Sequence, residues 1–351
     1  MRPVVLRCVV AWPLVVAACG SSGAGKTDDD ATDGGDGGPT LGADAASDAD
    51  APGDSGVGSL VAIPLTACVP NVYSAEMTLG GSQDFELLFD TGSTTLAVAA
   101  LGCSSCTAAD VATLYTPGPT AVDEKVTATS MYGAIDPSGW TGEIYEDWVG
   151  AGPSPDLARV KLVAIGQESQ FLVGRCGQEG TPEGVLGFAT SAIETTGTNG
   201  FFDEVVAGGK VPDVFATRMC PTGGTLWLGG YDPSFATAAP VYTPMVPPGG
   251  WYTVDLESIG VLGTTIPVPT GSYTATMLDT GSSGSSLSPA TFSALTSAIT
   301  ASPAFSGIFG TAASSFFSGS SCVTLSQTKA ELDAALPPLT LTFGSSPGVS
   351  A

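Results

Sequence analysis

Short apolar or alternating runs, separated by turn residues, make up most of the chain after Leu60. Runs bounded by Gly, Pro, Asn or Ser are typical of β-strands. The runs are Glu76–Leu79, Phe85–Phe89, Leu96–Ala99, Ile144–Val149, Val160–Ile165, Thr225–Leu228, Trp251–Ile259, Thr274–Leu278 and Leu339–Phe343. Two segments predict helices: Phe201–Ala207, and a segment from Pro289 to about Ile299 with Ser288 as a candidate N-cap. The pattern therefore predicts a mostly β fold.

Composition supports this prediction and excludes several kinds of chemistry. Gly (47) and Pro (26) are plentiful while only 13% of residues are charged, which favours many short strands joined by turns. The chain has 351 residues, enough for one large domain or two lobes. It has no histidine, which excludes a Ser-His-Asp triad, a Cys-His pair and a His-ligated zinc site. The net charge of −24 argues against a nucleic-acid partner, because phosphate binding needs a basic surface.

The first 19 residues have the features of an export signal. Arg2 and Arg7 precede an apolar stretch, Cys8–Ala18, that is too short to span a bilayer. The following Val16–Cys19 resembles a bacterial lipobox, which implies that residues 1–19 are a lipoprotein signal peptide and that Cys19 is acylated. We therefore expect an exported protein, lipid-anchored in the bacterial cell envelope through Cys19. An ordinary cleaved signal that happens to contain a cysteine is the alternative.

Residues 20–58 are a low-complexity segment with 11 Gly, nine Asp and no aromatic residue. Such a segment cannot bury enough apolar surface to offset the entropy lost on ordering. We expect a disordered Asp/Gly-rich linker. A calcium site is the alternative, but the regular Asp-x-Asp-x-Asp-Gly spacing is missing.

A six-residue motif occurs twice. Phe89-Asp90-Thr91-Gly92-Ser93-Thr94 is matched by Leu278-Asp279-Thr280-Gly281-Ser282-Ser283, and an apolar strand is predicted before each copy. A single Asp-Thr-Gly is ordinary turn chemistry. Two copies in the same context indicate two lobes related by an approximate two-fold axis, with the turns meeting between them.

With these motifs the chain resembles the pepsin-like aspartic endopeptidases. Four further segments add to the resemblance: Tyr73–Phe89, Glu183–Ala189, Leu226–Asp232 and Trp251–Ile259. The resemblance implies a two-lobed, mostly β pepsin-like acid protease fold with the active site between the lobes. It places the N-terminal lobe at residues 59–220 and the C-terminal lobe at 221–351. It also implies a peptide or protein substrate and no metal or organic cofactor, and we expect a monomer.

The resemblance also implies catalysis by Asp90 and Asp279. Two close carboxylates cannot both ionise cheaply, so they share one proton and together activate a water molecule for peptide-bond hydrolysis. Six residues are expected to support them: Thr91, Gly92, Ser93, Thr280, Gly281 and Ser282. The glycines would allow close backbone approach, the threonines would cross-brace the two turns, and the serines would hydrogen-bond the outer carboxylate oxygens.

Tyr132 and Gly133 resemble the tip of the hairpin that covers the active site in this family, the flap, and are expected to contact substrate. Two features depart from the family pattern. The segment after Tyr132 is a few residues longer than usual, and Ala97 stands where many members have a tryptophan that hydrogen-bonds the flap tyrosine. The alternative is a core or strand-edge Tyr132, with Trp140 covering the cleft.

Six cysteines remain outside the signal, in an exported domain where disulfides are expected. Cys103 and Cys106 lie where pepsin-like enzymes often have a short disulfide loop, which implies that they are bonded. A redox Cys-x-x-Cys is the alternative, but no thioredoxin-like helix start follows. The sequence leaves the pairing of four others open: Cys68, Cys176, Cys220 and Cys322.

The resemblance is uneven between the lobes. In the first lobe an apolar-apolar-Gly strand ending at Gly187 follows Asp90, whereas the same interval after Asp279 extends past Ala351. We therefore expect the second lobe to lack its closing strands. This leaves a second functional hypothesis open, a non-catalytic lipoprotein that binds peptide, glycan or another enzyme on the same scaffold.

Overall fold

The computed structural model describes residues 60–68, 72–107, 111–133, 138–172, 182–220, 222–236, 240–247, 249–269, 271–273, 275–317 and 325–344. Four predictions concern residues outside these ranges: the signal peptide with Cys19, the linker 20–58, Cys176 and Cys322.

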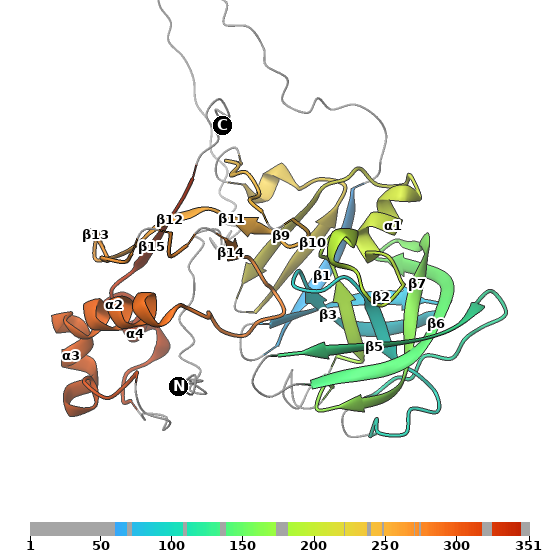
Figure 1. Ribbon diagram of the computed structural model, residues 1–351, viewed down its shortest axis with the longest axis horizontal. Coiled ribbons are helices and arrows are strands. Elements are labelled where there is room, and N and C mark those ends of the chain that lie inside the picture. Colours follow the sequence, from blue (N-terminus) through green and yellow to red (C-terminus); the bar gives the residue numbers. More distant parts are fainter. Residues whose placement is uncertain are drawn as a thin grey trace, which may run out of the picture.

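A large curved sheet dominates the first part of the chain (Figure 1). Its strands are β1 (Val61–Cys68), β2 (Val72–Leu79), β3 (Gln83–Asp90), β4 (Leu96–Ala99), β5 (Val122–Tyr132), β6 (Ser138–Ala151), β7 (Ser154–Ser169), β8 (Gly184–Gly187), β9 (Phe215–Cys220) and β10 (Gly223–Leu228). They lie in the order β5-β6-β7-β4-β8-β3-β2-β1-β10-β9, and β6 also pairs with β2. That extra pairing curls the sheet toward a barrel. β10 follows the predicted lobe boundary at residue 220, yet it pairs with β1 and so belongs to this sheet.

The second part of the chain has smaller sheets and most of the helices (Figure 1). Its elements are β11 (Thr253–Val254), β12 (Leu256–Val261), β13 (Thr264–Thr265), β14 (Thr276–Met277), α2 (Pro289–Thr300), α3 (Pro303–Phe309), α4 (Lys329–Ala335) and β15 (Leu339–Phe343). β11 pairs with β14, and β12 pairs with β13 and β15. Short 3₁₀ turns occur at Ser191–Ile193, Pro233–Phe235 and Gly310–Ala312.

Aromatic packing fills the core of the first lobe. Phe188 lies at the centre of this core, with its ring centroid 5.0 Å from those of Phe89 and Phe215. Helix α1 (Phe201–Ala207) adds two more rings, those of Phe201 and Phe202, each 5.4 Å from Phe188. This packing fixes the end of β3, and with it the position of the first aspartate.

The mostly β fold and both predicted helices are confirmed. In α2, the Ser288 hydroxyl accepts a hydrogen bond from the Thr291 N–H, and Pro289 begins the helix as expected. No single helix among the described residues has the length and hydropathy to cross a bilayer. The two segments Pro289–Thr300 and Pro303–Ala312 have that length and hydropathy only when taken together, and they are bent by 79° relative to each other.

Candidate active site

Asp90 ends β3, and its carboxylate is held by the turn that follows. The Gly92 N–H donates to Asp90 Oδ1 at 2.8 Å, and the Ser93 hydroxyl donates to Oδ2 at 2.5 Å. The side chain is deeply buried, with 5% of the residue exposed. Two donors aimed at one carboxylate compensate in part for its removal from water.

The second motif repeats this arrangement. The Gly281 N–H donates to Asp279 Oδ1 at 2.9 Å, and the Ser282 hydroxyl donates to Oδ2 at 2.6 Å. Asp279 is partly exposed, whereas Asp90 is buried. The same local sequence therefore gives the same turn, but in a more open environment.

Two threonines tie the turns together. The Thr91 N–H donates to Thr280 Oγ1 and the Thr280 N–H donates to Thr91 Oγ1, both at 3.0 Å. The Thr91 hydroxyl then donates to the Leu278 carbonyl at 2.8 Å, and the Thr280 hydroxyl to the Phe89 carbonyl at 2.9 Å. These four bonds join residues far apart in sequence and hold the two aspartates in one place.

Close approach explains the glycine in each motif. A Cβ on Gly92 would lie 2.6 Å from Asp279 Oδ1, and a Cβ on Gly281 would lie 2.3 Å from Asp90 Oδ1. Both distances are too short for any side chain. Each carboxylate therefore lies against the backbone of the opposite turn, and only glycine leaves room for it.

The buried carboxylate of Asp90 is easier to protonate than an ordinary one. Its pKa is raised from 3.8 to about 6, chiefly by desolvation, with smaller contributions from the charge of Asp279 and from a hydrogen bond with that side chain. The Ser93 hydroxyl and the Gly92 N–H act in the opposite direction, because they stabilise the charged form. The pair can therefore hold one proton in mildly acidic solution.

The strand behind the first turn is also constrained by its glycines. β8 runs parallel to β3, with Gly187 opposite Asp90. A Cβ on Gly187 would lie 2.5 Å from the backbone of Thr94 and Thr95. Behind the second turn, β14 pairs with β11 alone among the strands that the structure describes. Asp279 therefore has less support than Asp90.

Tyr132 lies close to the first aspartate. Burial raises the pKa of its hydroxyl and the charge of Asp90 raises it further, whereas the side chains of Ser130, Trp140 and Ser93 lower it. The next residue, Gly133, has φ 79°, a left-handed conformation suited to the turn at a hairpin tip. Trp140 is only 2% exposed and lies in the core below, so it does not cover the cleft in place of Tyr132.

Sequence reasoning missed the part played by Trp251 and Tyr252. The Trp251 indole N–H donates to the Gly92 carbonyl at 3.1 Å, and the Tyr252 hydroxyl donates to the Phe188 carbonyl at 2.7 Å. These contacts bind the second part of the chain to the first aspartate turn and the core beside it. The aromatic residues were visible at the start of a predicted strand, but no local pattern indicated their partners.

The predicted disulfide between Cys103 and Cys106 is present, with 5.5 Å between the Cα atoms. Cys68 and Cys220 each take part in a disulfide as well. The loop of Cys103 and Cys106 follows β4 and lies beside the core that contains Trp140. It therefore acts as a structural brace near the site.

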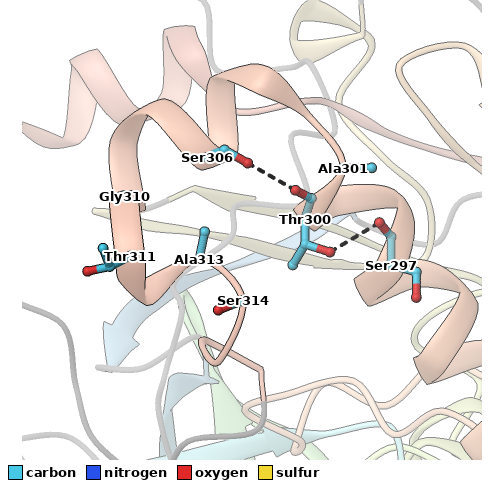
Figure 2. Close-up of a pocket in the computed structure, with 8 residues that line it drawn as sticks. All are labelled: Ser297, Thr300, Ala301, Ser306, Gly310, Thr311, Ala313 and Ser314. Carbon is cyan, nitrogen blue, oxygen red and sulfur yellow. Dashed lines mark hydrogen bonds between the residues drawn. The ribbon is translucent and has the colours of Figure 1, made fainter.

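A separate cavity of about 520 Å³ opens between α2 and α3 (Figure 2). Hydroxyl and small side chains line it, and its hydroxyls donate to helix carbonyls, as Thr300 does to Ser297 at 3.1 Å. Neither aspartate lines this cavity. We assign it no part in the chemistry.

Comparison with known proteins agrees with this geometry. The family model described as "Eukaryotic aspartyl protease" matches residues 72–344. The chain belongs to this aspartyl protease family. It is 29% identical to "Aspartic protease" of Phaffia rhodozyma over 212 residues, which cover 60% of this chain and 49% of that protein. It is 28% identical to "Pepsin A" of Sus scrofa over 225 residues, covering 63% of this chain and 56% of pepsin A. This chain thus spans about half the length of the curated relatives it matches.

Proposed function

We propose that this chain is an aspartic endopeptidase in which Asp90 and Asp279 activate water for peptide-bond hydrolysis. The observation that supports this most directly is the reciprocal packing of each carboxylate against the glycine of the opposite turn. Two carboxylates held this closely share one proton, which provides an acid and a base in one site.

In the proposed reaction, the ionised member of the pair takes a proton from a water molecule. The resulting hydroxide attacks the scissile carbonyl carbon, while the protonated member donates its proton to the carbonyl oxygen. Collapse of the tetrahedral intermediate breaks the C–N bond, and the leaving nitrogen receives a proton from the pair. No step requires a metal or an organic cofactor.

The surroundings of the pair support this chemistry. Ser93 and Ser282 each hydrogen-bond an outer carboxylate oxygen, and the threonine bonds keep the turns from separating. Tyr132 and Gly133 at the end of the hairpin would cover a peptide lying in an extended form across the pair. We expect bulky apolar side chains on either side of the cleaved bond.

The test is cleavage of an internally quenched peptide at about pH 3–5, where a carboxylate pair holds one proton. The wild-type protein should cleave it, and a pepstatin-type statine inhibitor should prevent cleavage. Asp90→Asn should abolish activity. The matched control is Asp84→Asn, an exposed carboxylate on the same strand whose Thr78 contact an asparagine can keep.

If the wild-type protein shows no inhibitor-sensitive cleavage, the endopeptidase proposal fails. The less supported turn of Asp279 would then favour the second hypothesis, a binding protein on the same scaffold. Isothermal titration with an extended, uncleaved peptide would give the affinity expected of such a binder.

We also propose that the protein is exported and held in the cell envelope by acylation of Cys19. The support is the lipobox-like Val16–Cys19 followed by the Asp/Gly-rich residues 20–58. Cys19→Ser should move the protein from the membrane fraction to the soluble fraction. Retention of the variant in membranes would contradict the lipid anchor.

A further inference from the structure

Trp140 belongs to the same hairpin as Tyr132, on its second strand. On β5 and β6, Tyr132 is opposite Ser138 and Ser130 is opposite Trp140. Tyr132 and Trp140 are therefore diagonal neighbours on the same face of the hairpin, close enough for large side chains to touch. The Trp140 indole N–H donates to the Tyr132 hydroxyl at 3.3 Å.

Neighbouring side chains hold Tyr132 from other sides. Its ring lies against that of Phe171, with 4.9 Å between centroids and 31° between planes. Ser93, which donates to Asp90, lowers the pKa of the Tyr132 hydroxyl, so the two hydroxyls lie near each other. Trp140 therefore contacts a tyrosine whose hydroxyl lies near the serine that holds the first aspartate.

The indole fits because its neighbours are small. Ala97 and Ala99 on β4 are fully buried in the same cluster as Trp140. Cores are close-packed, so a large side chain on β4 would compete with the indole for volume. The two alanines leave room for a tryptophan that comes from the hairpin itself.

We propose that Trp140 is a positioning residue that fixes the Tyr132 hydroxyl near Asp90 and so orients the Tyr132 side chain toward an extended peptide bound across the aspartate pair. This inference rests on the proposed function of Asp90 and Asp279. Both members of the hydrogen bond belong to one hairpin, so the register of its two strands sets the geometry of the bond. Without the indole N–H, the Tyr132 side chain samples orientations that do not face the aspartates.

The decisive variants are Trp140→Phe, which removes the N–H but keeps a buried ring, and Tyr132→Phe, which removes the hydroxyl. Each should lower kcat/KM about tenfold, the size expected for one lost hydrogen bond to a well-ordered group. In the double variant the second substitution should cost less than about twofold, because the interaction is already absent. Trp227→Phe is the matched control, since Trp227 is also buried but lies on β10 and packs on Phe235. It should leave kcat/KM unchanged.

A second readout does not depend on activity. The chain has five tryptophans, of which Trp12 lies in the predicted signal peptide, so a ¹⁵N-indole NMR spectrum of the mature protein contains four Nε1–H signals. The Trp140 signal is the one missing in Trp140→Phe, or is found by backbone assignment if that variant does not fold. Tyr132→Phe should shift this signal and speed its exchange with solvent, while the Trp227 signal stays in place.

The two readouts separate the two proposals. If Tyr132→Phe leaves the Trp140 signal unchanged, or if the losses in kcat/KM simply add in the double variant, the positioning proposal is wrong. If the wild-type protein cleaves nothing but the Trp140 signal responds to Tyr132→Phe, the endopeptidase proposal fails and the contact between Trp140 and Tyr132 stands.

Discussion

Replacing Asp90 with asparagine should change how the stability of the protein depends on pH. Burial raises the pKa of the Asp90 carboxyl from 3.8 to about 6 in the folded protein. One pKa unit corresponds to about 1.4 kcal/mol, so the shift amounts to about 3 kcal/mol. Asp90 is almost fully buried, so solvent screening does not reduce this figure much.

The sign follows from where the proton is bound. Between pH 3.8 and about 6 the folded protein keeps a proton that the unfolded chain has lost. The stabilising contribution is therefore fully present below pH 3.8 and is lost as the pH rises through about 6. Asparagine is neutral throughout, so Asp90→Asn should lack this loss.

Urea unfolding followed by tryptophan fluorescence would measure the effect. The free energy of unfolding is measured for Asp90→Asn and for the wild type at a pH below 3.8 and at a pH above about 6. The value for Asp90→Asn minus the value for the wild type should be larger at the higher pH by about 3 kcal/mol. Taking this difference cancels any pH-independent cost of the substitution, and the change seen in Asp84→Asn is subtracted as a control. A difference that varies by less than about 1 kcal/mol would refute the assignment of the raised pKa to buried Asp90.

Three other predictions concern the same site. Because Asp90 ionises with a pKa of about 6, kcat/KM should fall as the pH rises above that value. A kcat/KM that stays constant from acidic to neutral pH would contradict this. Thr280→Val should lower the free energy of unfolding by about 2–4 kcal/mol, because it removes two hydrogen bonds between the turns and leaves the Thr91 N–H unpaired. A urea titration with no change in midpoint would disprove this. Gly187→Ala should lower the free energy of unfolding by about 1–3 kcal/mol through overpacking against Thr94 and Thr95. Gly166→Ala is the control and should cost less, because a Cβ there meets nothing within 4 Å. Equal shifts of the melting temperature in the two variants would count against the packing argument.

Local sequence predicted much of the first lobe. Strand periodicity indicated β3 and β7, and Ser288 with Pro289 indicated the start of α2, because these signals depend only on neighbouring residues. The duplicated Asp-Thr-Gly motif likewise indicated two similar turns, since a turn of this kind is built from hydrogen bonds within a few residues. The resemblance added the short disulfide between Cys103 and Cys106.

Contacts between distant segments could not be read in this way. The indole of Trp251 reaches the Gly92 carbonyl across 159 residues of sequence, and no local pattern encodes that distance. The bond from Trp140 to Tyr132 was also missed, because a diagonal pair depends on the register of two strands and not on the spacing of the two residues.

The sequence by itself determined the chemistry available to this protein. It supplied two aspartates in matching turns, no histidine, and a glycine after each Asp-Thr pair. Only the tertiary structure decided that Asp90 is buried while Asp279 is partly exposed, and that each glycine faces the opposite carboxylate. The physical reason is that desolvation and charge repulsion act through space: burial and the neighbouring Asp279 raise the pKa of the Asp90 carboxyl, and neither effect is encoded in the local sequence of its turn.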